Sequence, residues 1–174
     1  MNNMILKEIY RAVLFSKLSS KYPSEFNIET KSNSYNDIHK IILNNNISFI
    51  ENKTFKCYVL KYNNTIYVAI HSILTYDPKK ITKMKDNIYV NTDVLEQYKE
   101  LEDQLIKNIN DLNKTKLIKK IYVCGYNVGG ALATLTSAIL AEKYNNLQNN
   151  VKLQLMLKDK DIELLTLKLQ LLQK

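Results

Sequence analysis

Few side chains in this sequence are of a type that could act as a nucleophile, a base or a metal ligand. The chain has two cysteines, Cys57 and Cys124, and two histidines, His39 and His71. Two cysteines make neither a disulfide framework nor a metal site, so we expect no metal and no cofactor. Cys124 falls within an apolar stretch, which favours a small core residue, and Cys57 lies on a predicted strand without an evident base. His71 lies at the end of a predicted strand, which leaves two alternatives: an acid/base or ligand role, or an ordinary polar residue at a strand end.

All three glycines of the chain lie together, at Gly125, Gly129 and Gly130. They follow an apolar run over residues 121–124 and open a segment rich in Ala and Leu that continues to about Tyr144. This order predicts a buried strand, a tight turn and a helix, because small residues let a strand, a turn and a helix approach closely. The residue in the middle of the turn is Asn127.

The segments that must position this turn have the periodicities of strands and helices. The predicted elements are a helix over 4–18 that ends before Pro23, a short helix over 36–44, strands over 55–62 and 65–70, a solvated lysine-rich loop over 77–85, a helix over 93–112 capped by Thr92 and Asp93, a strand over 121–125 and a helix over 129–144. Their order predicts an α/β fold, with a mixed, mostly parallel sheet and helices on both faces. Residues 151–172 leave two alternatives open, a hairpin or a strand followed by a helix.

The segment from Ile121 to Leu135 resembles the nucleophile elbow of the class 3 lipases, the triacylglycerol lipase branch of the α/β-hydrolases. That family's pattern is G-H-S-L-G-G-A-L-A-T-L, and this chain matches it at all three glycines and from Ala131 to Leu135. Residues 66–73 take the place of a strand ending in F-R-G-T, and residues 90–98 that of V-H-x-G-F-x-x-x-Y, where Tyr98 matches. The resemblance covers residues 55–145. We expect one domain over 1–174, with a lipase-like core over 55–145 and a divergent, Leu-rich tail over 146–174.

The resemblance assigns a role to each position of the turn. Asn127 stands at the position of the nucleophilic serine and Tyr126 at that of the preceding histidine. Val128 and Ile73 stand at the oxyanion-hole positions, and His71 and Ser72 at the mouth of the pocket. A carboxamide nitrogen is delocalised into its carbonyl and is no useful nucleophile at neutral pH.

The sequence also lacks the partners that the family places after its nucleophile. No histidine follows Asn127, the acids there are Glu142, Asp159, Asp161 and Glu163, and the chain ends 47 residues beyond the turn. We therefore expect a degenerate, truncated relative of lipid and ester hydrolases that is catalytically inactive and keeps a lipid-binding or regulatory role. The alternatives are an active lipase or esterase of lipid metabolism with a non-standard nucleophile, and a basic module that binds membrane surfaces or proteins.

The net charge of +8 comes almost entirely from lysine, since Arg11 is the only arginine. Lys79, Lys80, Lys83 and Lys85 form one cluster, for which an anionic membrane surface is a candidate partner. Nucleic acid is disfavoured, because arginine supplies the bidentate contact to guanine and no nucleic-acid-binding motif is present. A lipid or acyl ligand between residues 71–73 and 126–128, and a homodimer through the tail, are the other partners we expect. No apolar run reaches the length of a membrane helix and the first residues do not read as a secretory signal, which predicts an intracellular, cytoplasmic protein.

Overall fold

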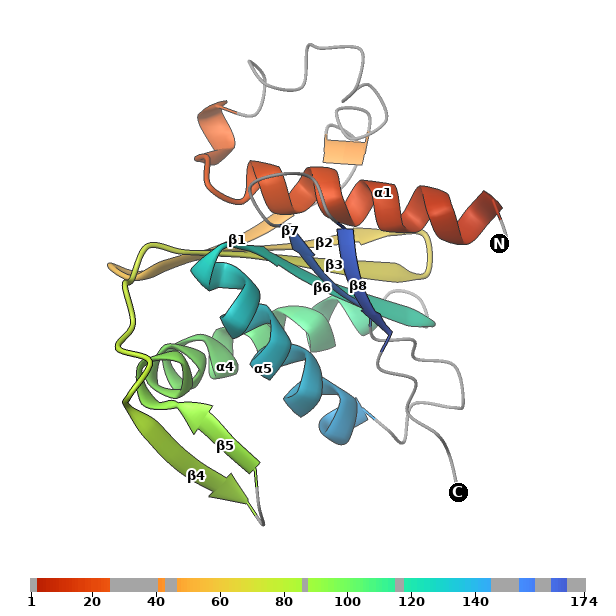
Figure 1. Ribbon diagram of the computed structural model, residues 1–174. Coiled ribbons are helices and arrows are strands. Elements are labelled where there is room, and N and C mark those ends of the chain that lie inside the picture. Colours follow the sequence, from red (N-terminus) through yellow and green to blue (C-terminus); the bar gives the residue numbers. More distant parts are fainter. Residues whose placement is uncertain are drawn as a thin grey trace.

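The computed structural model describes residues 3–25, 41–42, 47–85, 88–114, 118–144, 154–158 and 164–168. Within these residues the main feature is a six-stranded sheet with the strand order β1-β2-β3-β6-β7-β8 (Figure 1). Its strands are β1 (Ile47–Glu51), β2 (Phe55–Tyr62), β3 (Thr65–Ser72), β6 (Lys120–Tyr126), β7 (Gln154–Lys158) and β8 (Leu164–Lys168).

The sheet is mixed, as the sequence predicts. β6 runs parallel to both of its neighbours, β3 and β7. The β1–β2, β2–β3 and β7–β8 pairings are antiparallel, because short connections join these strands. Parallel pairing is thus confined to the two sides of β6, and the expectation of a mostly parallel sheet is wrong for the described pairings.

Helices cover both faces of the sheet, which confirms the predicted layering (Figure 1). Helix α1 (Asn3–Leu18) lies on one face, and α4 (Thr92–Asn113) and α5 (Val128–Tyr144) lie on the other. Side chains of β3 alternate between these layers: Ile66, Val68 and Ile70 pack on the α4 and α5 side, whereas Tyr67 and Ala69 pack on the α1 side. This strand is apolar almost throughout because neither of its faces meets water. The break predicted before Pro23 is also confirmed, since α1 ends at Leu18 and a short 3-10 helix spans Pro23–Glu25.

A second, two-stranded sheet replaces the loop that we expected over residues 77–85. Strands β4 (Ile81–Lys85) and β5 (Ile88–Asn91) pair antiparallel and project beside α4 and α5 (Figure 1). The alternation of apolar and polar residues that marks a strand is hidden here, because the residues of β4 are mostly exposed and two of them are lysines.

The helix that follows this hairpin begins one residue earlier than predicted. The side-chain oxygen of Asn91 accepts hydrogen bonds from the backbone N–H groups of Asp93 and Val94, at 3.0 and 3.3 Å. Asn91 is therefore the N-cap of α4 instead of Thr92 or Asp93, and asparagine is among the best residues for this position.

Two other segments depart from the expected elements. Strand β1 was not predicted, and of the short helix expected over 36–44 only Ile41 and Ile42, both helical, lie within the described residues. Of the two alternatives for the tail, the two strands β7 and β8 are present. The homodimer through the tail stays a prediction. In the described part of the chain, no helix combines the length and the apolar character needed to cross a bilayer.

Candidate functional site

The turn between β6 and α5 has the form that its glycines predict. Asn127 links the end of β6 to the first residue of α5, and its backbone φ of 53° lies in the left-handed region. Asparagine is one of the few residues other than glycine that tolerate this region. The backbone N–H of Gly130 donates to the carbonyl oxygen of Asn127 at 2.8 Å, which closes the turn. Asn127 is exposed, so its side chain stands at the tip of the turn.

Two of the glycines allow backbone segments to touch. A Cβ atom on Gly125 would lie 2.1 Å from the carbonyl oxygen of Gly129, and one on Gly129 would lie 2.4 Å from the carbonyl oxygen of Ile70. Gly125 therefore lets α5 begin directly against β6, and Gly129 lets it pack against the end of β3. No described glycine has a positive φ, so close approach explains these residues and backbone conformation does not.

The carboxyl end of β3 lies beside the turn, as the resemblance implies. His71 is the ladder partner of Tyr126, the residue before Asn127. A Cβ atom on Gly129 would also lie 3.0 Å from the backbone nitrogen of Ser72 and 3.1 Å from Cα of His71. The structure thus brings together the two segments that the sequence predicts at one site, residues 71–73 and 126–128.

His71 is half-buried on the α1 side of the sheet, between its ladder partners Lys56 and Tyr126. Burial, and then the positive charge of Lys56, lower the pKa of the His71 imidazole, which keeps it neutral at pH 7. Its Nδ1 atom is buried and has no hydrogen-bond partner among the described residues. Within the described part of the chain, this imidazole therefore lacks the orienting partner that a catalytic base has in a triad. The other histidine, His39, lies outside the described residues.

Ser72 is held by hydrogen bonds on the opposite side of the sheet. Its hydroxyl lies 3.0 Å from Nε2 and 3.1 Å from Oε1 of Gln97, a buried residue of α4, and accepts from the backbone N–H of Leu74 at 3.3 Å. Gln97 also donates from Nε2 to the carbonyl oxygen of Thr54 at 3.1 Å. Ser72 thus fixes the strand end to α4. Sequence reasoning missed Gln97 as its partner, because the two residues are distant along the chain.

Ile73 and Val128 occupy the positions that the resemblance assigns to the oxyanion hole. The backbone N–H of Ile73 donates to the carbonyl oxygen of Thr54 at 3.0 Å, while the Ile73 side chain is 61% exposed. This N–H is therefore engaged within the protein. Val128 is the first residue of α5, and N–H groups in the first turn of a helix have no partner within the helix.

Neither cysteine is placed to replace a serine nucleophile. Cys57 and Cys124 are both fully buried, and their burial raises the pKa of both thiols. The thiol of Cys124 donates to the carbonyl oxygen of Val68 at 3.4 Å. The interpretation of Cys124 as a core residue is confirmed.

The acids expected after the turn do not complete a triad in the described part of the chain. Glu142, near the end of α5, pairs with Lys85 at 2.9 Å, and both side chains are largely exposed. Asp159, Asp161 and Glu163 lie outside the described residues. Asn127 therefore has no described acid or base that would activate it.

Comparisons with known proteins place this fold among lipases. The sequence model of the lipase (class 3) family matches residues 53–156. Three solved structures are similar in fold: the lipase from Rhizopus microsporus var. chinensis (TM-score 0.64, 14% identity, 89% of this chain and 58% of that one), lipase II from Rhizopus niveus (0.64, 15%, 88% and 62%) and the Rhizomucor miehei triacylglyceride lipase (0.59, 18%, 89% and 62%). The chain spans about three fifths of the length of these lipases. No curated protein sequence matches it.

Proposed function

Because this chain belongs to the class 3 lipase family, we propose that it is a lipase-like domain that no longer hydrolyses esters and has kept a lipid-binding or regulatory role. The observation that carries this proposal is the exposed Asn127 at the tip of an otherwise intact strand-to-helix turn. The turn serves to present a hydroxyl to a substrate carbonyl, and a carboxamide cannot take over that attack.

The state of the neighbouring groups supports the loss of hydrolysis. An acyl-transfer site needs a base beside the nucleophile and N–H donors free to bind the developing oxyanion. Here the backbone N–H of Ile73 is already bonded to Thr54, and the imidazole of His71 has no orienting partner among the described residues. Restoring the hydroxyl alone would therefore leave two further requirements unmet.

We assign the residual ligand, an acyl chain or another lipid, to the carboxyl ends of β3 and β6, between residues 71–73 and 126–128. The exposed side chain of Ile73 offers apolar surface at these strand ends, and the contact of Gly129 with the end of β3 keeps the two segments together. This proposal predicts that Ile73→Asp weakens the binding of a fluorescent long-chain fatty acid about tenfold, because burying a charge against an acyl chain is unfavourable. If Ile73→Asp binds the fatty acid as tightly as the parent does, the ligand does not bind at these strand ends.

Hydrolysis of a short-chain p-nitrophenyl ester tests the loss of activity. We expect the parent chain to hydrolyse the ester no faster than buffer without protein does. The same is expected of Asn127→Ser, because the serine would still lack a base. A fungal class 3 lipase on the same ester is the positive control, and the thermal unfolding of both proteins shows that they are folded.

Two outcomes would contradict the proposal. Turnover by the parent chain that disappears in Asn127→Ala would show an active enzyme with a non-standard nucleophile, the alternative function. Turnover that appears in Asn127→Ser would show that a base and an oxyanion hole are present after all.

A further inference from the structure

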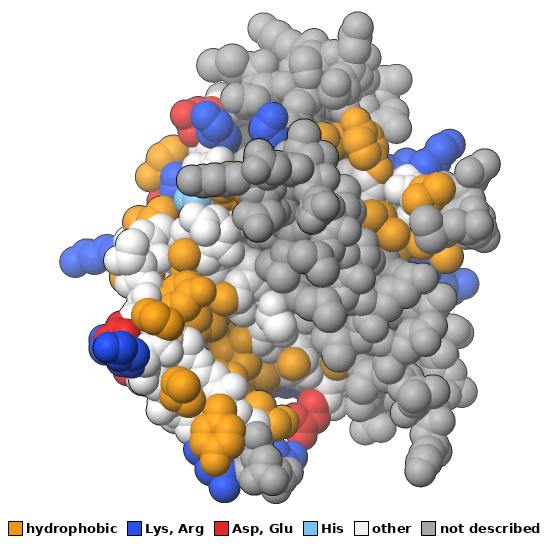
Figure 2. All heavy atoms as spheres, viewed as in Figure 1, with side chains coloured by type: hydrophobic (Ala, Val, Ile, Leu, Met, Phe, Trp, Pro, Cys, Tyr) orange, Lys and Arg blue, Asp and Glu red, His pale blue; other side chains and the backbone are white. Residues whose placement is uncertain are grey.

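Exposed apolar side chains concentrate on one part of the molecule. Nine large hydrophobic side chains are exposed in the described part of the chain, and six of these lie on the hairpin β4–β5 or on the segment that leads to it: Ile73, Tyr76, Ile81, Met84, Ile88 and Tyr89. We call these six residues the hairpin surface. Figure 2 shows hydrophobic side chains, in orange, running down the left side of the molecule to its lower end, where the hairpin lies in Figure 1. A concentration of this kind marks an interaction site more often than chance exposure does.

The register of the hairpin directs part of this surface away from the core. Thr82 is the ladder partner of Val90, and Val90 packs against the core beside α4 and α5. Lys83, the residue after Thr82 on β4, is the partner of Tyr89, the residue before Val90 on β5, so these two residues lie on the opposite, outward face. Ile81 lies on the same outward face as Lys83, and Ile81 and Tyr89 are 62% and 61% exposed. An aromatic ring, an aliphatic side chain and an ammonium group thus share one outward face.

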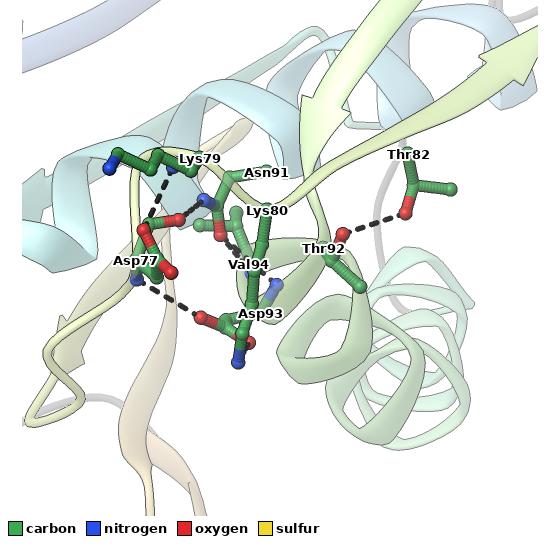
Figure 3. Close-up of polar contacts among 8 residues, drawn as sticks. All are labelled: Asp77, Lys79, Lys80, Thr82, Asn91, Thr92, Asp93 and Val94. Atoms are coloured by element: carbon green, nitrogen blue, oxygen red, sulfur yellow. Dashed lines mark hydrogen bonds and ion pairs between the residues drawn. The ribbon is translucent and has the colours of Figure 1, made fainter.

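Hydrogen bonds fix the base of the hairpin to the beginning of α4 (Figure 3). The side chain of Asn91 donates to the carbonyl oxygen of Asp77 at 2.6 Å, and the backbone N–H of Asp77 donates to the Asp93 carboxylate at 3.2 Å. The hydroxyl groups of Thr82 and Thr92 lie 2.8 Å apart. The outward face is therefore held in place before any partner arrives, which lowers the entropic penalty of docking.

The four lysines of this region are not equivalent. Lys80 pairs with Asp93 at 3.2 Å and Lys85 pairs with Glu142 at 2.9 Å. The ammonium groups of Lys79 and Lys83 have no carboxylate partner among the described residues, and both residues are exposed. Positive charge that no described carboxylate neutralises therefore lies on and beside the outward apolar face.

We propose that the hairpin surface docks this protein on an anionic lipid bilayer. Apolar side chains that enter the interface and lysines that meet lipid phosphates are the two contributions that such binding combines. Tyrosine, present here at Tyr76 and Tyr89, favours the level of the headgroups. A second copy of this chain fits less well, because it would bring the same unpaired lysines face to face. The docking is independent of the chemistry at Asn127, so it would hold whether or not the chain hydrolyses esters.

Cosedimentation of the full chain with vesicles tests this proposal. One set of vesicles is phosphatidylcholine alone and the other contains about a third phosphatidylserine, each at low and at physiological salt. We expect binding to the anionic vesicles that weakens as salt rises, because salt screens the lysine–phosphate attraction. Little binding to phosphatidylcholine vesicles is expected, and equal binding to both sets would overturn the role of the lysines.

Paired variants separate the hairpin surface from net charge and general hydrophobicity. Lys79→Gln with Lys83→Gln is expected to weaken binding roughly 25-fold, since each lysine near an anionic surface is worth about fivefold. Ile81→Ser with Tyr89→Ser is expected to weaken it at least about tenfold through lost apolar insertion. The matched controls, Lys99→Gln with Lys119→Gln and Leu6→Ser, change exposed residues elsewhere and are expected to bind as the parent does.

Two results would contradict the proposal directly. Equal losses in the Lys79/Lys83 variant and in the Lys99/Lys119 control would show that net charge alone drives binding. A dimer in sedimentation velocity that Ile81→Ser with Tyr89→Ser dissolves, without any vesicle binding by the parent, would identify a second copy as the occupant. All changed side chains are exposed, so unchanged unfolding midpoints can confirm that each variant is folded.

Discussion

Replacing Gly125 by alanine is expected to destabilise the protein by about 3 kcal/mol or more, at the upper end of the range for overpacked sites. The added Cβ would lie 2.1 Å from the oxygen and 2.4 Å from the carbon of the Gly129 carbonyl, and 2.8 Å from the nitrogen of Gly130. All three are backbone atoms, so no side chain can rotate away to relieve the overlap. The start of α5 would have to move off β6, and that movement would also disturb the contact of Gly129 with Ile70.

Urea unfolding followed by circular dichroism measures this effect. Asn127→Gly in the same turn is the control, and its stability is expected to stay within about 1 kcal/mol of the parent because glycine accepts a φ of 53° without steric strain. A Gly125→Ala protein as stable as the parent would show that the close approach of α5 to β6 is not required.

Replacing Glu8 by alanine is expected to be the second large effect, a loss of about 2–3 kcal/mol, because it leaves a partly buried ammonium group and a buried hydroxyl without their shared acceptor. Glu8 belongs to α1 and is 8% exposed. Its Oε2 atom accepts from the ammonium group of Lys120 at 2.7 Å and from the hydroxyl of Tyr122 at 2.8 Å. Alanine would leave the ammonium group of Lys120, whose side chain is 24% exposed, and the hydroxyl of the buried Tyr122 without this acceptor.

The exposed ion pair between Lys114 and Asp111 provides the comparison. Its atoms are also 2.7 Å apart, but the two side chains are 75% and 49% exposed. Asp111→Ala is expected to leave the free energy of unfolding nearly unchanged, because water and salt screen such pairs. Similar losses for Glu8→Ala and Asp111→Ala in urea unfolding would show that α1 is held by its apolar contacts and that Glu8 contributes little.

Local signals in the sequence were enough to predict the turn and the elements around it. Three glycines grouped in a chain that has no others predicted the strand-to-helix turn, and the turn is where they indicated. The apolar run of β3 and the helical spacing of apolar residues in α4 predicted those elements to within a residue or two. These features depend on neighbours along the chain, which a sequence displays directly.

The rest of the site depends on contacts between distant segments. The engagement of the Ile73 N–H depends on where Thr54 lies across the sheet, and the burial of Ser72 depends on Gln97 from α4. The hairpin β4–β5 escaped prediction because its strands are exposed and lack the apolar alternation of half-buried strands. The four lysines of this region look alike in the sequence. In the fold two of them pair with Asp93 and Glu142, which are distant along the chain.

Because the backbone at Asn127 is left-handed, the choice of residue at this position affects both the chemistry of its side chain and the stability of the turn. A serine at the tip of such a turn must be held in a region of φ and ψ that disfavours it, at a cost of about 1–2 kcal/mol, and the surrounding fold must supply that energy. Asparagine occupies the same region more readily. Asparagine at this position therefore carries no nucleophilic hydroxyl and also strains the turn less than serine would. A chain released from selection for catalysis would gain stability from asparagine here, and serine would require the fold to carry that strain.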